Sequence, residues 1–428
     1  MKMNINTKPL NMKARSNKAL FILCYYAFLL LAYVLLSRPE IEYSLSFRLL
    51  FFAATLMPAI KNTTYFTTSI VCFYSMTYIA FTPILPTSLI YYIPIVLLYY
   101  IIHFKSSRNI TYQIFFLLYY FSICMYYEDY DTFLSSFLIA IIISSFINKD
   151  WQLDYIASAL MVSSIILSIL FYTNMDYYVY AYGSSHDQDR YGWINPNEYA
   201  GAVGCGGVVA MQYLFSNIQT HRSWLKLLSY ITLFVSAIIV VINASRGAAI
   251  SFGGVLLLFI LLSRNRNRYK LISSVFILGV FYFIAQNDYS TFLLSRFEDS
   301  SLYTWSGRLV IWKTKLDTFV GDSNILEFLF GVGRVGSIKI PPVISTHNDF
   351  LTAFIGFGLV GVILLCIILL FPILKASKTN KLPIILMTLY LVLECNVLEP
   401  LFRGYFTFVI FFFYIYKNAI IRKASINE

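Results

Sequence analysis

The sequence has little charge. Only 12% of its 428 residues are Asp, Glu, Lys or Arg, whereas soluble globular domains carry roughly a quarter. Hydrophobic residues make up 59% of the chain and aromatic residues 18%. The chain also lacks a low-complexity tract, an evident internal repeat, and a polar region large enough to form a separate soluble domain. This composition excludes an ordinary soluble protein and indicates one membrane domain that covers residues 1–428.

Histidine and cysteine are also scarce, which limits metal and disulfide chemistry. The four histidines are scattered, and the six cysteines fall within apolar stretches without the spacing of metal ligands or of a disulfide framework. We therefore expect no metal site. The basic run at 264–270 contributes to the net charge of +11, but it directly follows an apolar stretch, where Lys and Arg anchor cytoplasmic loops. We therefore expect no nucleic-acid partner.

Apolar stretches of about the length that crosses a bilayer recur along the chain, separated by short polar breaks. They predict an all-α polytopic integral membrane protein with about 12–14 transmembrane helices. Three of the candidates, the second one and the two that flank 243–247, are also compatible with short or re-entrant segments. The candidate spans are Ala19–Leu36, Ser44–Ile60, Thr64–Phe81, Pro86–His103, Ile110–Tyr127, Thr132–Ile147, Tyr155–Tyr172, Tyr199–Phe215, Leu227–Ile242, Ala248–Ser263, Leu271–Gln286, Phe350–Phe371, Leu382–Val397 and Gly404–Tyr416.

The distribution of Lys and Arg predicts the orientation, because basic residues near helix ends are retained on the cytoplasmic side. It places both termini inside the cell and two large loops outside, at about 173–198 and 287–349. The first apolar stretch is too long for a signal peptide and has no small-x-small cleavage pattern, so we expect it to remain as an anchor. Most polar residues outside the membrane lie in these two loops, so we expect the function there.

Four arginines on the outer side run against the orientation bias: Arg190, Arg246, Arg308 and Arg334. A guanidinium group stays charged and binds phosphate oxygens through two parallel hydrogen bonds, so converging arginines can hold a diphosphate. The alternative for each is an ion pair with a nearby acid or a contact with a lipid headgroup. An ion pair or a headgroup contact fits Arg246 least well of the four, because apolar helices flank it closely and no acidic residue is near it in sequence.

The longer loop closes on Ser345-Thr346-His347-Asn348-Asp349-Phe350. Imidazole exchanges a proton near neutral pH, and Asn348 and Asp349 offer an orienting acceptor and a cap for the helix that begins at Phe350. The alternative is an interfacial histidine that bonds lipid or a loop carbonyl. Upstream, the segment 331–336 is rich in glycine, but it follows no strand and has no Lys-Ser/Thr pair. It predicts a turn with positive φ angles rather than a nucleotide site.

Taken in order, several motifs resemble the O-antigen polymerase and O-antigen ligase superfamily. The resemblance covers roughly 190–371 well and the first half only by hydropathy. The motifs are Asn195-Pro196-Asn197-Glu198-Tyr199-Ala200, Ser245-Arg246-Gly247-Ala248, Gly307-Arg308 with Trp312, Gly331-Val332-Gly333, His347-Asn348-Asp349-Phe350-Leu351 and Gly356-Phe357-Gly358-Leu359-Val360-Gly361.

This resemblance implies a membrane glycosyltransferase of GT-C-like architecture in the bacterial inner membrane, with its active face periplasmic and with no metal or other cofactor. It implies an undecaprenyl-diphosphate-linked glycan donor and an inverting transfer. His347 matches the family histidine thought to act on the acceptor hydroxyl, and Arg246 and Arg308 match arginines held to engage the donor diphosphate. As substrate-binding candidates we take Asn197, Asn348, Asp349, Arg190, which is a looser match, and Arg334, which has no assigned counterpart.

The family resemblance leaves the acceptor open between another lipid-linked repeat unit, for a polymerase, and lipid A-core, for a ligase. The 346–351 motif, the 195–197 segment and the Tyr/Phe/Ile-rich composition look more like polymerases, which we favour. A polysaccharide flippase would have similar size and charge, but it should carry ionisable residues within its spans, and these spans have almost none. The expected partners are lipid-linked donor and acceptor and membrane lipids; a chain-length regulator, a polysaccharide co-polymerase, is left open.

Overall fold

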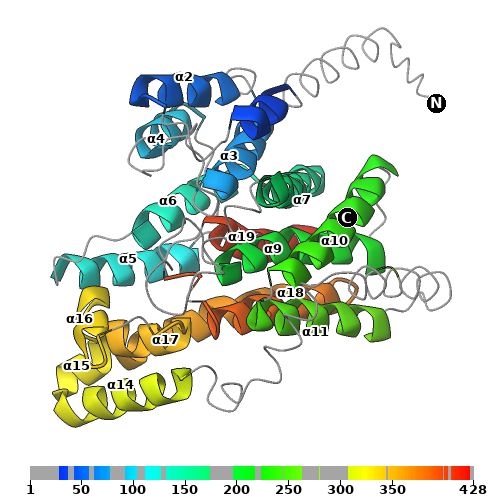
Figure 1. Cartoon of the computed structure of the whole chain (residues 1–428). Helices are drawn as coiled ribbons and strands as arrows, with labels where there is room; N and C mark the ends of the chain where they lie inside the picture. The colour runs from blue at the N-terminus through cyan, green and yellow to red at the C-terminus, as the bar shows by residue number, and fades with distance from the viewer. Residues whose placement is uncertain are drawn as a thin grey trace, which may run out of the picture.

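The computed structural model is entirely helical over the residues that it describes (Figure 1). The described residues are 28–36, 43–56, 62–77, 92–103, 111–126, 132–173, 196–216, 223–243, 245–262, 279, 307–343, 346–398, 400–402 and 406–424. The candidate span 271–286, except for residue 279, lies outside them, and so does Arg190.

The helices of the first half and the middle of the chain agree with the candidate spans to within a few residues at most ends. They are α2 (Leu45–Leu56), α3 (Thr63–Thr77), α4 (Tyr92–His103), α5 (Thr111–Tyr126), α6 (Thr132–Ser145), α7 (Asp150–Thr173), α9 (Pro196–Phe215), α10 (Ser223–Ile242) and α11 (Arg246–Leu262). The last part of the chain forms α14 (Arg308–Asp322), α15 (Ile325–Phe330), α16 (Arg334–Lys339), α17 (Asp349–Lys375), α18 (Lys381–Cys395) and α19 (Phe406–Ala424).

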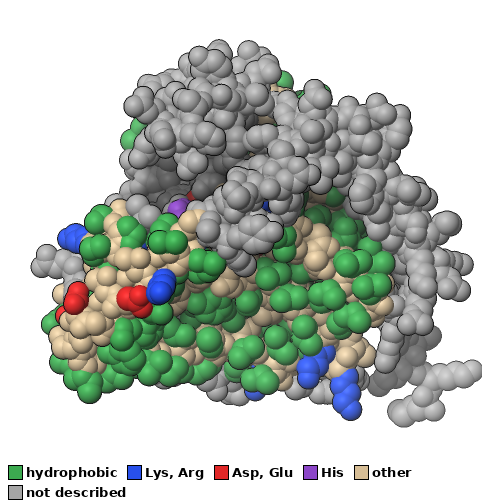
Figure 2. All heavy atoms as spheres, turned by 60° about the horizontal axis from the view of Figure 1, so that its bottom comes forward, with side chains coloured by type: hydrophobic (Ala, Val, Ile, Leu, Met, Phe, Trp, Pro, Cys, Tyr) green, Lys and Arg blue, Asp and Glu red, His purple; other side chains and the backbone are tan. Residues whose placement is uncertain are grey.

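Three described helices are long and apolar enough to cross a membrane, namely Asp150–Thr173, Trp224–Ile242 and Asp349–Lys375. Large apolar side chains stay exposed on α11 and α17, among them Leu257, Leu261, Ile367 and Leu374. Figure 2 shows this face as a broad hydrophobic area with charged side chains toward its two ends. An exposed apolar area of this extent is typical of a lipid-facing surface, so the all-helical fold is that of a membrane protein.

The Gly-rich helix α9 lies at the centre, between α7, α10 and α11 (Figure 1). A Cβ atom at Gly207 would lie 2.5 Å from the Phe252 ring, and one at Gly206 would collide with Ser164. Small residues therefore let the backbone of α9 approach its neighbours closely, as in other membrane helix interfaces. The helix begins at Pro196, which suits the first helical position because it has no N–H to satisfy.

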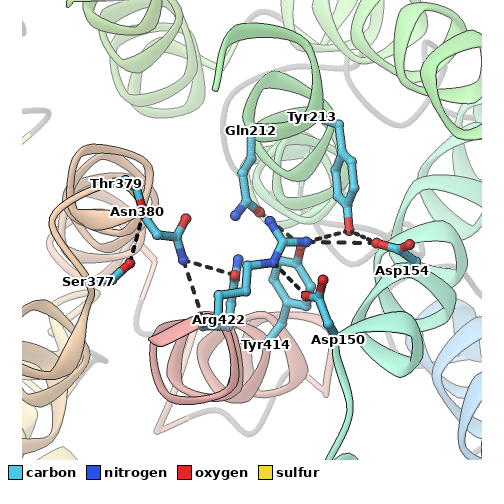
Figure 3. Close-up of polar contacts among 10 residues, drawn as sticks. Asp150, Asp154, Gln212, Tyr213, Ser377, Thr379, Asn380, Tyr414 and Arg422 are labelled. Atoms are coloured by element: carbon cyan, nitrogen blue, oxygen red, sulfur yellow. Dashed lines mark hydrogen bonds and ion pairs between the residues drawn. The ribbon is translucent and has the colours of Figure 1, made fainter. Parts of the chain in front are cut away.

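A polar cluster joins α7, α9 and α19 at the end that is predicted from the sequence to be cytoplasmic (Figure 3). The buried Arg422 guanidinium donates to Asp150 at 3.0 Å and lies 3.7 Å from the Asp154 carboxylate. The Tyr213 hydroxyl accepts from Arg422 at 3.2 Å and donates to Asp154 at 2.8 Å. Beside them the Tyr414 hydroxyl donates to the Gln212 side chain at 2.8 Å. These bonds fix the ends of three helices to one another.

The apolar pattern predicted one straight helix over the candidate span 350–371, and this prediction was wrong. The chain breaks at Gly358, whose φ of 67° and ψ of −171° are accessible to glycine and to few other residues. A Cβ atom at Gly361 would lie 3.1 Å from the Ala353 carbonyl oxygen, although residues eight apart in a straight helix are separated by about 12 Å. The segment after Gly358 therefore bends back onto the short helix 349–357.

The break leaves carbonyl groups without their helical partners, and other segments supply donors. The Val332 and Gly333 amides donate to Ile355 and Gly356 at 3.0 and 2.9 Å, and the Tyr119 hydroxyl donates to the Phe357 carbonyl at 2.6 Å. Gly331 and Gly333 have φ angles of 83° and 74°, which confirms the predicted turn. The two Gly-rich motifs of the sequence thus pack against each other.

The described part of the predicted loop 287–349 contains three helices, α14, α15 and α16, which pack beside α17 (Figure 1). Lys315 of α14 is fully buried, and its ammonium group donates to the Ser337, Ile338 and Ile340 carbonyls at 2.7, 3.4 and 2.9 Å. A buried ammonium group needs such acceptors, and these carbonyls lie at the end of α16. Lys315 therefore fixes α16 to α14.

Candidate functional site

The turn that follows α18, residues 396–398, is the meeting point of the segments that carry the candidate residues. It forms because the Glu394 carbonyl accepts from the Val397 and Leu398 amides, both at 2.9 Å. The Val397 carbonyl then points away from the helix and is available to another donor. We call residues 396–398 the α18 turn.

Arg308 supplies that donor. It is the first residue of α14, preceded by Gly307 with a φ of 80°, and its Nη1 atom donates to the Val397 carbonyl at 2.8 Å. Its side chain is half-buried. One turn later, the Trp312 indole N–H donates to the Thr346 carbonyl at 2.7 Å, so α14 also holds the segment just before His347.

Arg246 approaches the α18 turn from α11. It is the first residue of that helix, and the preceding Ser245 side chain accepts the Ala248 amide at 3.3 Å, as an N-cap does. The next residue, Gly247, lies so close to Val397 that a Cβ atom there would collide with the valine side chain. The two arginines therefore begin two helices that both contact Val397.

The His347 segment reaches the same turn. The Asn348 side chain donates to the Asn396 side chain at 3.3 Å and accepts from the Phe350 and Leu351 amides at 2.9 and 3.1 Å. Asn348 thus caps α17, as the sequence predicted. His347 itself is half-buried and has a φ of 50°, in the left-handed region that L residues seldom adopt.

Asp349 is fully buried, and its two carboxylate oxygens accept the Leu401 and Phe402 amides, each at 3.0 Å. The carboxylate therefore attaches the start of α17 to the chain that follows the α18 turn. The expectation that Asp349 orients His347 stays a prediction. The contacts of Asp349 with the Leu401 and Phe402 amides were not predicted from the sequence.

The other candidates occupy different places. Arg334 is half-buried at the start of α16, where its Cα lies 3.6 Å from the Cβ position of Gly356, so it lies at the far end of the short helix from His347. Asn197 is in the first turn of α9, one turn before Gly201, whose Cβ position lies 3.0 Å from Leu398. Asn197 thus lies in the first turn of a third helix that packs against the α18 turn.

The sequence reasoning missed the α18 turn itself. No chemical motif is formed by Asn396, Val397 and Leu398. Val397 and Leu398 contribute backbone or apolar contacts, which a residue pattern does not predict. Across the described parts of the chain, no three His, Cys, Asp or Glu residues are grouped closely enough to hold a metal ion.

One family of known proteins matches the part of the chain that carries most of these residues. Residues 231–366 match the family model described as O-Antigen ligase, a range that includes Arg246, Arg308, Arg334 and the 347–349 motif and leaves out Asn197 and Arg190. A search of the curated proteins found no match. The resemblance of this chain to the O-antigen polymerase and ligase superfamily is therefore confirmed, and it is carried by residues 231–366.

Proposed function

We propose that this protein is a surface-polysaccharide polymerase that joins undecaprenyl-diphosphate-linked oligosaccharide repeat units at the periplasmic face of the inner membrane. The observation that carries the proposal is the convergence of Arg308, the Arg246 helix and the His347 segment on the α18 turn. These segments are up to about 100 positions apart in the sequence, and they contact two neighbouring residues of that turn, Asn396 and Val397. Their proximity favours one shared site over separate structural roles.

The residue chemistry fits a glycosyl transfer. The acceptor sugar hydroxyl attacks the anomeric carbon of the donor, the bond from that carbon to the diphosphate oxygen breaks, and undecaprenyl diphosphate leaves from the opposite face. His347 accepts the hydroxyl proton as a general base, a role that typically contributes roughly 10²–10⁴-fold. Arg246 and Arg308 stabilise the negative charge that develops on the departing diphosphate, because guanidinium groups bind phosphate oxygens. The configuration at the anomeric carbon is inverted.

The left-handed backbone of His347 supports its role. A non-glycine residue in this conformation costs roughly 1–2 kcal/mol, and such costs cluster at active sites where they fix a reacting group. Here the Thr346 and Thr352 hydroxyls bond at 2.6 Å and the Asn348 cap follows directly, so both sides of His347 are held in place.

A ligase that transfers the glycan to lipid A-core is the second candidate, favoured by the description of the matching family. The two activities share donor and site and differ in the acceptor. We place the polymerase first on the sequence form around 346–351 and 195–197 and on the aromatic composition.

Deletion of the gene, read as a glycan ladder, separates the candidates. A polymerase deletion leaves a single repeat unit on the lipid core and no long chains. If instead polymer accumulates on the lipid carrier with none on the core, the ligase is correct, and repeats trapped at the cytoplasmic face would indicate a flippase. Complementation with His347→Ala, at wild-type expression, should fail to restore the ladder.

A further inference from the structure

Glu394 is an acidic side chain in the apolar interior for which the proposed reaction has no direct use. It lies in the last turn of α18 and is fully buried. Its Oε1 atom accepts a hydrogen bond from the Ser251 hydroxyl of α11. Burying a carboxyl group among membrane helices is costly, so a polar partner and a role are expected for it.

Its backbone already shapes the site, because the Glu394 carbonyl accepts both amides that form the α18 turn. The turn in turn presents the Val397 carbonyl to Arg308. Glu394 therefore lies only three positions before Val397, whose carbonyl binds the Arg308 guanidinium.

Its side chain acts on the other arginine. Ser251 and Gly247 are four residues apart on α11, so they lie on the same face of that helix. Ser251 bonds Glu394, and Gly247 packs against Val397. These two contacts hold the first turns of α11, which begin at Arg246, against the end of α18.

The same carboxyl group also touches α9. A Cβ atom at Gly201 would lie 2.8 Å from Glu394 Oε2, and the Gly201 carbonyl accepts from the Tyr390 hydroxyl of α18 at 2.6 Å. Glu394 thus lies where α9, α11 and the α18 turn meet. Asn197 is in the first turn of α9, Arg246 begins α11, and the α18 turn binds Arg308.

We propose that Glu394 is a positioning residue: by bonding Ser251 and shaping the α18 turn, it sets the spacing between Arg246 and Arg308 that the donor diphosphate requires. This inference rests on the proposed function. What matters for this role is the length of the side chain and its hydrogen-bonding oxygen, and its acidity does not enter.

Three substitutions at position 394 test this in the full-length protein, purified and reconstituted in lipid nanodiscs. Glu394→Gln keeps the length and an acceptor oxygen, and should bind undecaprenyl diphosphate and react within about twofold of the parent. Glu394→Asp keeps the acid but is too short for Ser251, and Glu394→Leu removes the bond. Both should weaken undecaprenyl diphosphate binding, raise donor KM and lower kcat/KM by roughly 10–100-fold, as expected for misplaced groups. Thr388→Val, a buried polar change on the same helix, is the matched control and should leave donor KM unchanged.

Activity in the Asp variant with none in the Gln variant would overturn the inference in favour of an acid–base role. Normal binding and kinetics in all three would overturn it as well. Arg246→Ala and Arg308→Ala, assayed alongside, separate the two levels: if they too bind undecaprenyl diphosphate normally, the proposed donor site itself is wrong. If only the two arginine variants lose binding, the proposed donor site is supported and the proposed role of Glu394 is wrong.

Discussion

Arg308 donates a 2.8 Å hydrogen bond to the carbonyl of Val397, a residue 89 positions away, and Gly247 packs against the side chain of that same valine. Two arginines that the sequence identifies separately are thereby tied to one turn. This shared attachment to the α18 turn is the structural basis of the proposed site.

Replacing Arg308 should cost more activity than replacing Arg334. Arg308→Ala removes a cation at the α18 turn and should lower kcat/KM by roughly 10²–10³-fold, the effect of losing one group that stabilises developing charge. Arg308→Lys should restore part of it, because lysine keeps the charge but loses the planar fork. Arg334→Ala should cost less than tenfold, since Arg334 lies at the far end of the short helix 349–357. Equal losses for the two alanine variants, measured with lipid-linked donor, would contradict the convergence at this turn.

The break in α17 should depend on glycine at position 358. Gly358→Ala places a Cβ atom against the Leu329 backbone and forces alanine into a conformation nearly restricted to glycine, at roughly 1–3 kcal/mol. We expect a lower midpoint of thermal unfolding and a loss of activity. Gly321→Ala in α14 is the control, because nothing lies within 4 Å of its Cβ position. It should leave the midpoint unchanged or raise it slightly. A Gly358→Ala protein as stable as this control would disprove the break.

Lys315 should stabilise the α14–α16 unit through its three carbonyl acceptors. Lys315→Met keeps the apolar stem but leaves those carbonyls without their charged donor, where each such bond contributes roughly 1.5–3 kcal/mol. The thermal midpoint should fall by several degrees, with faster proteolysis within 307–343. The exposed Lys313, two residues earlier, provides the comparison, and Lys313→Met should change neither quantity. Similar behaviour of the two variants would argue against the buried contact.

In the Arg422 cluster the two aspartates should contribute unequally. The Asp154 side chain is 16% exposed and also accepts from Tyr213, whereas Asp150 is 55% exposed and screened by solvent. Asp154→Ala should therefore lower the thermal midpoint clearly more than Asp150→Ala, because it leaves a buried guanidinium with less compensation. The reverse order would show that the cluster is not organised around the buried pair.

Much of the fold was predictable from the sequence, because long apolar stretches form the helices and the polar breaks between them form the connections. The cap at Asn348 was also visible in the sequence, whereas the start of α11 at Arg246 and its cap at Ser245 were found only in the structure. The break at Gly358 was not, since an uninterrupted apolar run conceals a bend that depends on the partner segment 331–333. The α18 turn was hidden for a related reason: its contacts with Arg308 and Gly247 join distant segments through a backbone carbonyl and a valine.

The role of His347 is tested by glycan polymerisation with the purified full-length protein in lipid vesicles, supplied with undecaprenyl-diphosphate-linked repeat units and analysed for chain length. His347→Ala is compared with the parent and with His103→Ala; His103 lies at the end of α4, on the side that the sequence predicts to be cytoplasmic. If His347 is the general base, His347→Ala should lower the polymerisation rate by roughly 10²–10⁴-fold at unchanged thermal stability, and His103→Ala should behave like the parent. Long chains formed at the parental rate by His347→Ala would contradict it.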